Sequence, residues 1–251
     1  MTSKAGAGVF RHPVQVNTRY RMLNLKYSRP LFVGGTRYCF AHPQYGDRCV
    51  KVLRPDRTGE VRKRYRKDFK RYLPARILDD QRKEIIAYEA LDRTASAAHW
   101  RHVPRYHGTV ATDMGLGIVT ELLRNEDGSW PKNLRELFSL GEVRAQSHDD
   151  ADEREAITTR PAQDQIALLD GIDEFLEAVR ELRILSRDLL AHNIVALKEE
   201  SRYRVVLVDG IGNAELIPVS SWSDLFAARK VERKIARFRQ RYREYLTASK
   251  R

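Results

Sequence analysis

The sequence has very few cysteines and lacks any long apolar run. Its 251 residues include only Cys39 and Cys49, which fall on neighbouring strands of a predicted hairpin. A cross-strand disulfide is one interpretation, and a pair of buried thiols is the commoner one in a chain without a secretory signal. Residues 1–20 contain no signal-peptide core, and no segment offers the ~18 uninterrupted apolar residues of a membrane span. These absences argue against a secreted or membrane-spanning protein, and we expect a cytoplasmic one.

Positive charge dominates the composition. The formal net charge is +12, and it is concentrated in two runs, residues 61–71 with seven basic residues and one acid and residues 229–243 with eight basic residues and one acid. Such runs attract anionic partners, which include nucleic acid, lipid head groups and phosphorylated sugars. A solvated helix face in a basic protein would give the same pattern, so both interpretations stay open.

The first half of the chain predicts a small antiparallel sheet. Residues 1–22 lack periodicity and are expected to form an N-terminal arm. Short apolar and β-branched runs separated by turn formers then predict strands. The predicted strands are residues 31–33, 38–41, 49–53, 103–110 and 116–123. One helix is expected at residues 79–91, where apolar residues recur at spacings of three and four.

Lys51 and Glu84 are the charged residues of interest in this half. Lys51 lies between Val50 and Val52, so in a strand it points to the opposite face from both. Glu84 lies on the predicted helix, which places a carboxylate within reach of the lysine. Such a pair would fix the ammonium group on nucleotide phosphates. A solvent-facing strand lysine is the commoner explanation when Lys51 is considered alone.

The second half predicts a mainly helical unit. Residues 124–132 are polar and contain Gly and Pro, so they are the best candidate for a boundary between residues 23–123 and residues 124–251. The elements expected beyond it are a short helix at 133–140, an exposed loop at 141–160, a long helix at 162–185, a hairpin of strands at 194–197 and 203–208, and a helix at 222–247.

Asp188, Asn193 and Asp209 form the candidate catalytic group. Asp188 follows the long helix, and the hairpin places Asn193 and Asp209 at the same end of two paired strands. Phosphoryl transfer uses this set, because one aspartate can accept a hydroxyl proton while Asn and Asp oxygens bind Mg²⁺. Each of these residues, taken alone, is also of a type that is common in turns and loops.

The order of these elements is that of an α+β, bilobal protein-kinase-like fold. It has an N-lobe of a five-stranded antiparallel sheet plus one helix and a reduced, mostly helical C-lobe. More closely, residues 34–43 (GGTRYCFAHP), 104–110 (PRYHGTV) and 217–222 (IPVSSW) resemble the YrbL family of enteric bacteria. Members of that family are known from the PhoP regulatory network and are kinase-like in fold. The resemblance extends over about residues 28–240 and is most specific at PRYHGTV.

The resemblance implies a role for each candidate residue. Lys51 corresponds to the phosphate-binding lysine, Glu84 to its helix partner, and Asp188 to the catalytic aspartate, with Asn193 and Asp209 as metal ligands. The implied cofactors are ATP and Mg²⁺. The nucleotide-binding residues implied by the resemblance are Gly34, Gly35, Thr36, Lys51, Glu121 and Leu122.

Several positions depart from the usual kinase pattern. Leu190 stands where a Lys or His is usual, His-Arg-Asp becomes Ser186-Arg187-Asp188, and Asp-Phe-Gly becomes Asp209-Gly210-Ile211. The glycine turn has only two glycines, and no Ala-Pro-Glu follows Asp209. The platform that docks peptide substrates is therefore missing.

The sequence thus predicts an ATP- and Mg²⁺-dependent phosphotransferase that acts on a small-molecule, lipid or sugar hydroxyl. An anionic acceptor could lie near residues 61–71 and 229–243. The first alternative is a pseudokinase, nucleotide-binding or inactive, that works as a regulatory scaffold. The second is a basic nucleic-acid-binding protein, although the sequence has no recognisable nucleic-acid module.

Overall fold

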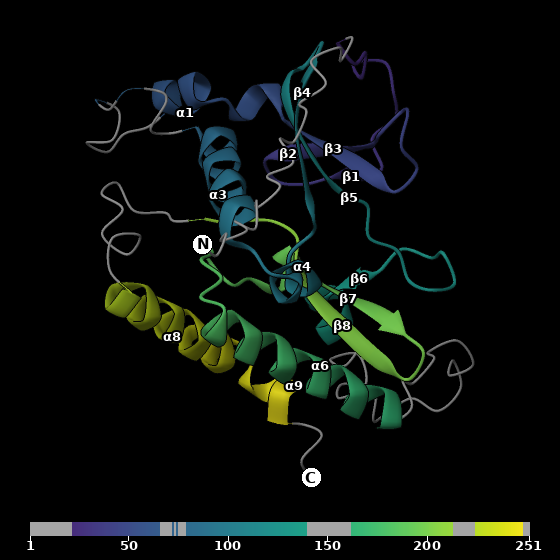
Figure 1. Ribbon diagram of the computed structural model, residues 1–251, viewed down its shortest axis with the longest axis vertical. Coiled ribbons are helices and arrows are strands. Elements are labelled where there is room, and N and C mark those ends of the chain that lie inside the picture. The colour runs from purple at the N-terminus through teal and green to yellow at the C-terminus, as the bar shows by residue number, and fades with distance from the viewer. Residues whose placement is uncertain are drawn as a thin grey trace, which may run out of the picture.

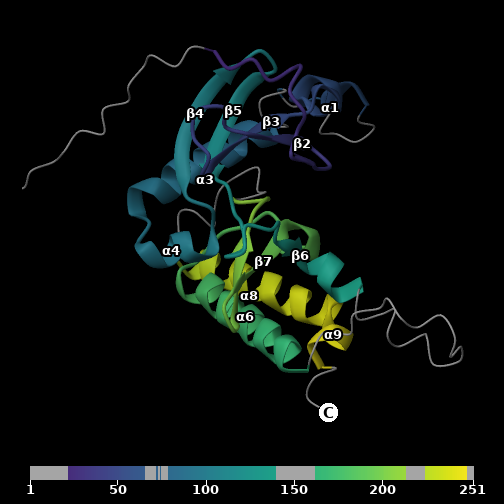
Figure 2. The same ribbon diagram turned by 90° about the vertical axis from the view of Figure 1, so that its right-hand side faces the viewer.

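The computed structural model describes residues 22–65, 72, 74, 79–139, 162–212 and 224–247 (Figure 1). The predicted arm at 1–22, apart from Met22, lies outside these residues, as do the predicted loop at 141–160 and the segment 217–222 that contributed to the family resemblance. The molecule has an upper lobe built on one sheet and a lower lobe built on a second sheet and helices (Figure 2). None of the described helices is long and apolar enough to cross a membrane.

The N-lobe contains the predicted five-stranded antiparallel sheet, in the order β1-β2-β3-β5-β4. Its strands are β1 Phe32–Val33, β2 Arg37–Ala41, β3 Arg48–Leu53, β4 Tyr106–Thr112 and β5 Gly115–Glu121. Strand β4 begins three residues later than predicted, and a short helix, α4 Ala97–His102, precedes it. Cys39 and Cys49 lie on β2 and β3 as expected, and both are free thiols.

Among the described residues, three helices lie between β3 and β4 instead of the one predicted. Helix α3 Asp80–Thr94 is the expected one, and the Asp79 carboxylate caps it by accepting hydrogen bonds from the backbone N–H groups of Gln81 at 2.9 Å and Arg82 at 3.1 Å. Helix α4 and helix α1 Gly59–Tyr65 were not predicted. Glu60 in the first turn of α1 and basic residues in its last turn complement the helix dipole, a signal that Pro55 and Gly59 obscured in the sequence.

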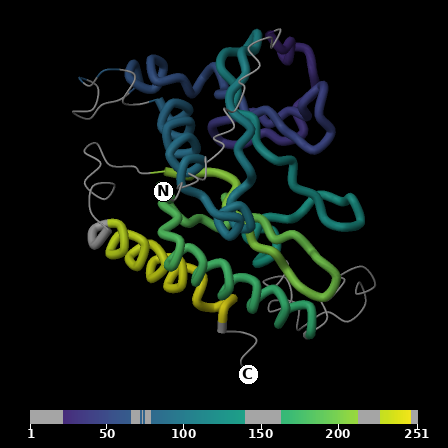
Figure 3. The backbone as a smooth tube through the Cα atoms, in the orientation of Figure 1, coloured from purple at the N-terminus to yellow at the C-terminus, as the bar shows by residue number. Residues whose placement is uncertain are grey.

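The C-lobe combines a small sheet with long helices. Its sheet has the order β6-β7-β8, formed by β6 Lys132–Asn133, β7 Ile194–Glu199 and β8 Arg202–Leu207. The loop between β5 and β6 leads the chain into this lobe (Figure 3). Residues 134–139 are helical, followed among the described elements by α6 Ala162–Glu181, the 3₁₀ turn η3 Ala191–Asn193, α8 Asp224–Arg241 and α9 Arg243–Thr247.

The long helix α6 ends earlier than predicted, at Glu181. Arg183 has a φ of 52°, a left-handed conformation that an α-helix cannot continue through. Within the helix, Ile166 is 51% exposed, whereas Phe175 is fully buried. Gly171 sets the contact with β8, because a Cβ atom there would lie 2.4 Å from the carbonyl oxygen of Tyr203. Only glycine allows this helix and strand to approach so closely.

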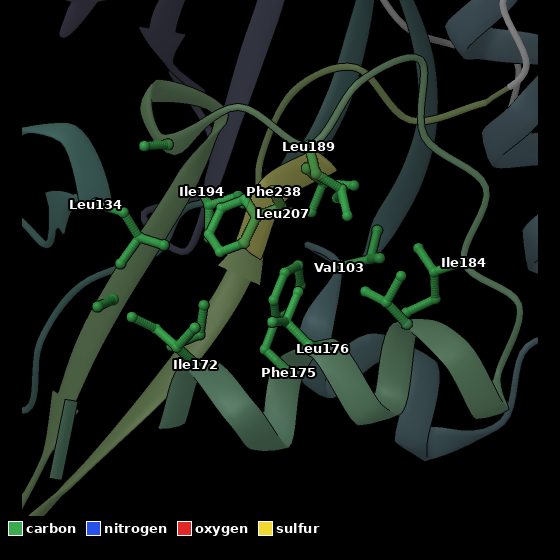
Figure 4. Close-up of a cluster of buried hydrophobic side chains, with 14 of the residues drawn as sticks. Val103, Leu134, Ile172, Phe175, Leu176, Ile184, Leu189, Ile194, Leu207 and Phe238 are labelled. Atoms are coloured by element: carbon green, nitrogen blue, oxygen red, sulfur yellow. The ribbon is translucent and has the colours of Figure 1, made fainter. Parts of the chain in front are cut away.

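The main core lies between α6, α8 and the β7–β8 hairpin (Figure 4). Leu189, Ile194 and Leu207 belong to it and are 1%, 0% and 0% exposed. Each of them is next to, or two residues from, a predicted site residue in the sequence. The core therefore holds the backbone that carries those polar side chains in one position.

Candidate active site

The end of the β7–β8 hairpin brings the predicted catalytic group together. Ile194 pairs with Leu207, and the backbone N–H of Val208 donates to the carbonyl of Asn193 at 2.8 Å. Arg187 donates its backbone N–H to the carbonyl of Gly210 at 2.6 Å, one residue before Asp188. Asn193 and Asp209 thus lie at the same end of two paired strands, as predicted, with Asp188 on the adjoining segment.

Gly210 lies at the centre of this arrangement. Its φ is 80°, and a Cβ atom there would lie 3.5 Å from Nδ2 of Asn193 and 3.8 Å from the carbonyl oxygen of Asp188. The space would accept a methyl group, but the backbone conformation is one that side chains disfavour. The turn thereby presents Asp188, Asn193 and Asp209 around a single glycine.

Replacing Gly210 by Ala should lower stability by about 1–2 kcal/mol, because an L-residue is strained at positive φ. Urea unfolding of the variant and the parent measures the difference. Gly46→Ala is the matched control, since a Cβ there meets nothing within 4 Å and the backbone is not at positive φ. Equal stability of the Gly210 variant and the parent would show that this turn can relax.

Lys51 links the N-lobe sheet to this turn. Its neighbours Val50 and Val52 lie in the core, and Lys51 itself is half-buried on the other face of β3. Its Nζ donates a hydrogen bond of 2.7 Å to the carbonyl oxygen of Val208, directly before Asp209. The structure therefore places the predicted phosphate-binding lysine beside the predicted metal ligand.

Arg37 is the principal residue that the sequence analysis missed. It is only 5% exposed, and its guanidinium lies 2.8 Å from Glu84 and 2.6 Å from Asp209. Its Nε donates to Gln81 at 2.9 Å, and Nη2 donates to the carbonyl oxygen of Asp80 at 3.2 Å. The first residue of a strand after a glycine turn gives no local signal of burial, so only the tertiary structure reveals this role.

Glu84 makes its closest ion pair with Arg37, not with Lys51 as expected. The contact is not an aligned hydrogen bond, and among the described residues neither oxygen of Glu84 accepts one. Burial raises the pKa of Glu84, and although Arg37 opposes this effect, Asp209 adds a second negative charge that favours the protonated form. Lys51 is close enough to contribute a smaller opposing effect on the same pKa.

Arg187 joins the same network from the segment that carries Asp188. Its guanidinium lies 3.1 Å from Asp80, 3.5 Å from Asp209 and 3.6 Å from Glu84. Arg62 of the first basic run also pairs with Asp80. Arg62 is therefore committed to the α3 network, whereas residues 66–71 lie outside the described part of the chain.

Asp209 remains an accessible anion within this network. Burial acts to raise its pKa, but Arg37, Lys51 and Arg187 together outweigh burial and hold the pKa below the usual range. Its side chain is 38% exposed. The polar contacts that the described residues make to it, from Arg37, Arg187 and the Gly210 N–H, all go to Oδ1. Oδ2 makes no polar contact with any of these residues.

The other predicted nucleotide-binding residues lie along the N-lobe side. The N–H of Gly34 donates to the carbonyl of Arg37 at 2.8 Å, and a Cβ on Gly35 would meet nothing within 4 Å, so the Gly34-Gly35-Thr36 turn borders open space. Glu121 ends β5. The N–H of Leu122 is already bonded to the carbonyl of Asp47 at 2.8 Å.

The second basic run is divided between two faces of α8. Its described arginines are exposed, whereas Lys230 is buried and Lys234 is half-buried. The exposed members are Arg229, Arg233, Arg237, Arg239, Arg241 and, in α9, Arg243. The arginine face can attract an anionic partner, while the two lysines point into the C-lobe.

The sheet, the Glu84 helix, the hairpin and the Asp188 segment define a two-lobed protein of protein-kinase-like architecture. A family model described as PhoP regulatory network protein YrbL matches residues 23–243, and the chain belongs to that family. The chain is 30% identical over 218 residues to "Uncharacterized protein YrbL" of Escherichia coli (strain K12), with 86% of each chain covered. The Shigella flexneri protein of the same name gives the same values.

Solved kinase domains are also similar to this chain. A double mutant of the Mycobacterium tuberculosis PknI kinase domain matches with a TM-score of 0.40 and 15% identity, over 72% of this chain and 58% of that one. The BubR1 kinase domain matches with a TM-score of 0.43 and 12% identity, over 76% of this chain and 48% of that one. The chain thus spans only about half the length of these two structures.

Proposed function

We propose that the protein is an ATP- and Mg²⁺-dependent phosphotransferase. The observation that carries this proposal is the convergence of Lys51, Asp188, Asn193 and Asp209 around the Gly210 turn. These residues come from segments far apart in the sequence. A loop that served only to connect strands would have no need of a half-buried lysine from the other lobe.

The side chains present fit a magnesium ion. Oδ2 of Asp209 and the side-chain oxygen of Asn193 are hard oxygen ligands of the kind Mg²⁺ prefers. The described residues contain no cluster of three or more His, Cys, Asp or Glu that could hold a metal. The ligand set therefore suits an ion that arrives with nucleotide phosphates and water. Such an ion would neutralise charge on the phosphates when bound.

In the proposed reaction, Asp188 accepts the proton of an acceptor hydroxyl. The hydroxyl oxygen forms a bond to the γ-phosphorus of ATP, the bond from that phosphorus to the β–γ bridging oxygen breaks, and ADP leaves with the electron pair. Lys51 would hold the phosphates in position. The short sequence between Asp209 and α8, with no Ala-Pro-Glu, supports a small-molecule, lipid or sugar hydroxyl as the acceptor.

ATP with Mg²⁺ should raise the melting temperature of the protein. A ligand that binds only the folded state stabilises it by about 2.7 kcal/mol at one hundred times its dissociation constant. Lys51→Ala and Asp209→Asn should each lose the shift measured against its own ligand-free melting temperature, whereas Lys26→Met, at an exposed position in the N-lobe, should keep it. Absence of any shift in the parent protein at millimolar Mg·ATP would refute the proposed function.

One observation favours a second candidate, a pseudokinase that acts as a regulatory scaffold. The guanidinium of Arg37 lies 2.6 Å from Oδ1 of Asp209 and could take the place of a cation there. A pseudokinase of this kind would bind Mg·ATP weakly or not at all and would release no phosphate from it. Phosphate release by the parent protein that Asp188→Asn abolishes separates the two candidates.

A further inference from the structure

The inner face of α8 carries a lysine toward the catalytic segment. Val231, Ile235 and Phe238 are buried and anchor this face in the C-lobe core. Lys234 lies on the side adjoining these residues and is half-buried, whereas Arg233 and Arg237 are exposed. The side chain of Lys234 is therefore held against the protein, and it is not part of the solvated arginine face.

Lys234 contacts the segment that holds Asp188. Its Nζ donates a hydrogen bond to the carbonyl oxygen of Arg187, the residue before Asp188. Burial lowers the pKa of Lys234, and the nearby charge of Asp188 opposes that effect by stabilising the ammonium form. A partly desolvated ammonium group thus lies near the proposed catalytic carboxylate, on a helix that begins 36 residues after it.

The proposed chemistry needs a cation at this place. Negative charge is spread over the oxygens of a transferring phosphoryl group, and an anionic Asp188 beside it would repel that charge. Leu190 is apolar, and the guanidinium of Arg187 is directed to Asp80, Asp209 and Glu84. Neither Arg187 nor Leu190 therefore directs a cation at the phosphoryl group.

We infer that Lys234 supplies the positive charge that stabilises the transferring phosphoryl group beside Asp188. The inference rests on the proposed function and adds a residue to it. The hydrogen bond to Arg187 fixes where the ammonium group lies, and the low polarity of a half-buried position strengthens its attraction for the phosphoryl oxygens.

The test compares Lys234→Gln with Lys234→Arg and with Lys26→Met. Glutamine can still donate a hydrogen bond to Arg187 but carries no charge, whereas arginine keeps the charge. Calorimetry measures the affinity for Mg·ADP alone and for Mg·ADP with fluoroaluminate, which mimics the transferring phosphoryl group. Lys234→Gln should weaken the fluoroaluminate complex by about 100-fold and leave Mg·ADP affinity within twofold. The arginine and Lys26 variants should resemble the parent.

The outcomes separate this inference from the proposed function. If the parent does not bind Mg·ADP, the proposed function fails and the inference fails with it. If the parent binds Mg·ADP and fluoroaluminate does not strengthen binding, or strengthens it equally in Lys234→Gln, the inference alone is overturned. The inference is also overturned if Lys234→Gln loses affinity for Mg·ADP to the same extent as for the fluoroaluminate complex. It is likewise overturned if Lys234→Arg binds the fluoroaluminate complex as weakly as Lys234→Gln does. Either result would mean that Lys234 has a structural role.

Discussion

Asp188→Asn is expected to reduce phosphoryl transfer by about 10²–10⁴-fold, the usual contribution of a positioned general base. Asparagine has nearly the same size as aspartate but cannot accept the proton. Mg·ATP affinity should change little, because Lys51, Asn193 and Asp209 remain. Single-turnover kinetics with ATP, using water as the acceptor until a better one is found, measures the chemical step separately from binding.

Asp173→Asn is the control for this experiment. Asp173 is exposed on α6, where it pairs with Arg239 at 3.3 Å. The Asp173→Asn substitution removes the same charge from the protein and leaves Asp188, Asn193 and Asp209 unchanged. Unchanged turnover in Asp188→Asn, measured against this control, would mean that Asp188 is a structural turn residue.

Arg37→Met should cause the largest loss of stability among the variants considered. It leaves the fully buried Glu84 without its closest cation and removes one of the three cations beside Asp209. Removing one partner of a buried ion pair typically destabilises a protein by about 3–5 kcal/mol. Urea unfolding at neutral pH measures the effect, provided that Arg37→Met still folds at low temperature.

A double-mutant cycle tests the physical cause. If the loss comes from an uncompensated carboxylate, Arg37→Met combined with Glu84→Gln should be more stable than Arg37→Met alone. Arg54→Met serves as the control, because Arg54 pairs with the exposed Asp56, and exposed pairs contribute little. Purely additive losses in the double variant would show that Arg37 stabilises the fold through packing and not through charge.

The sequence was sufficient to predict the part of the site that depends on local order. Alternating strands separated by turn residues predicted the hairpin, and the hairpin placed Asn193 and Asp209 at one end, as the pairing of Ile194 with Leu207 confirms. The five-stranded sheet was predictable for the same reason, because each strand is bounded by its own turn. The role of Asn193 and Asp209 in binding nucleotide or metal stays a prediction.

Contacts between distant segments could not be predicted in this way. Arg37 contacts Asp209, which is 172 positions away in the sequence, and Lys234 contacts Arg187, which is 47 positions away. A basic residue at the start of a strand, or one among many in a basic helix, looks like a solvated charge until its neighbours are known. The pairing of Glu84 with Arg37 in place of Lys51 has the same origin, since either cation was compatible with the sequence pattern.

The close contact at Gly171 has a consequence for how the site can adapt to a ligand. Helix α6 and strand β8 meet backbone to backbone at this point, with no side chain between them that could rotate or compress. The hairpin and the helix therefore form a rigid unit, and this unit fixes the distance between Asn193 and Asp209 at the end of the hairpin. Accommodation of ligands of different size must then come from the opposing surface, where Lys51 and Arg37 reach the turn from the N-lobe sheet.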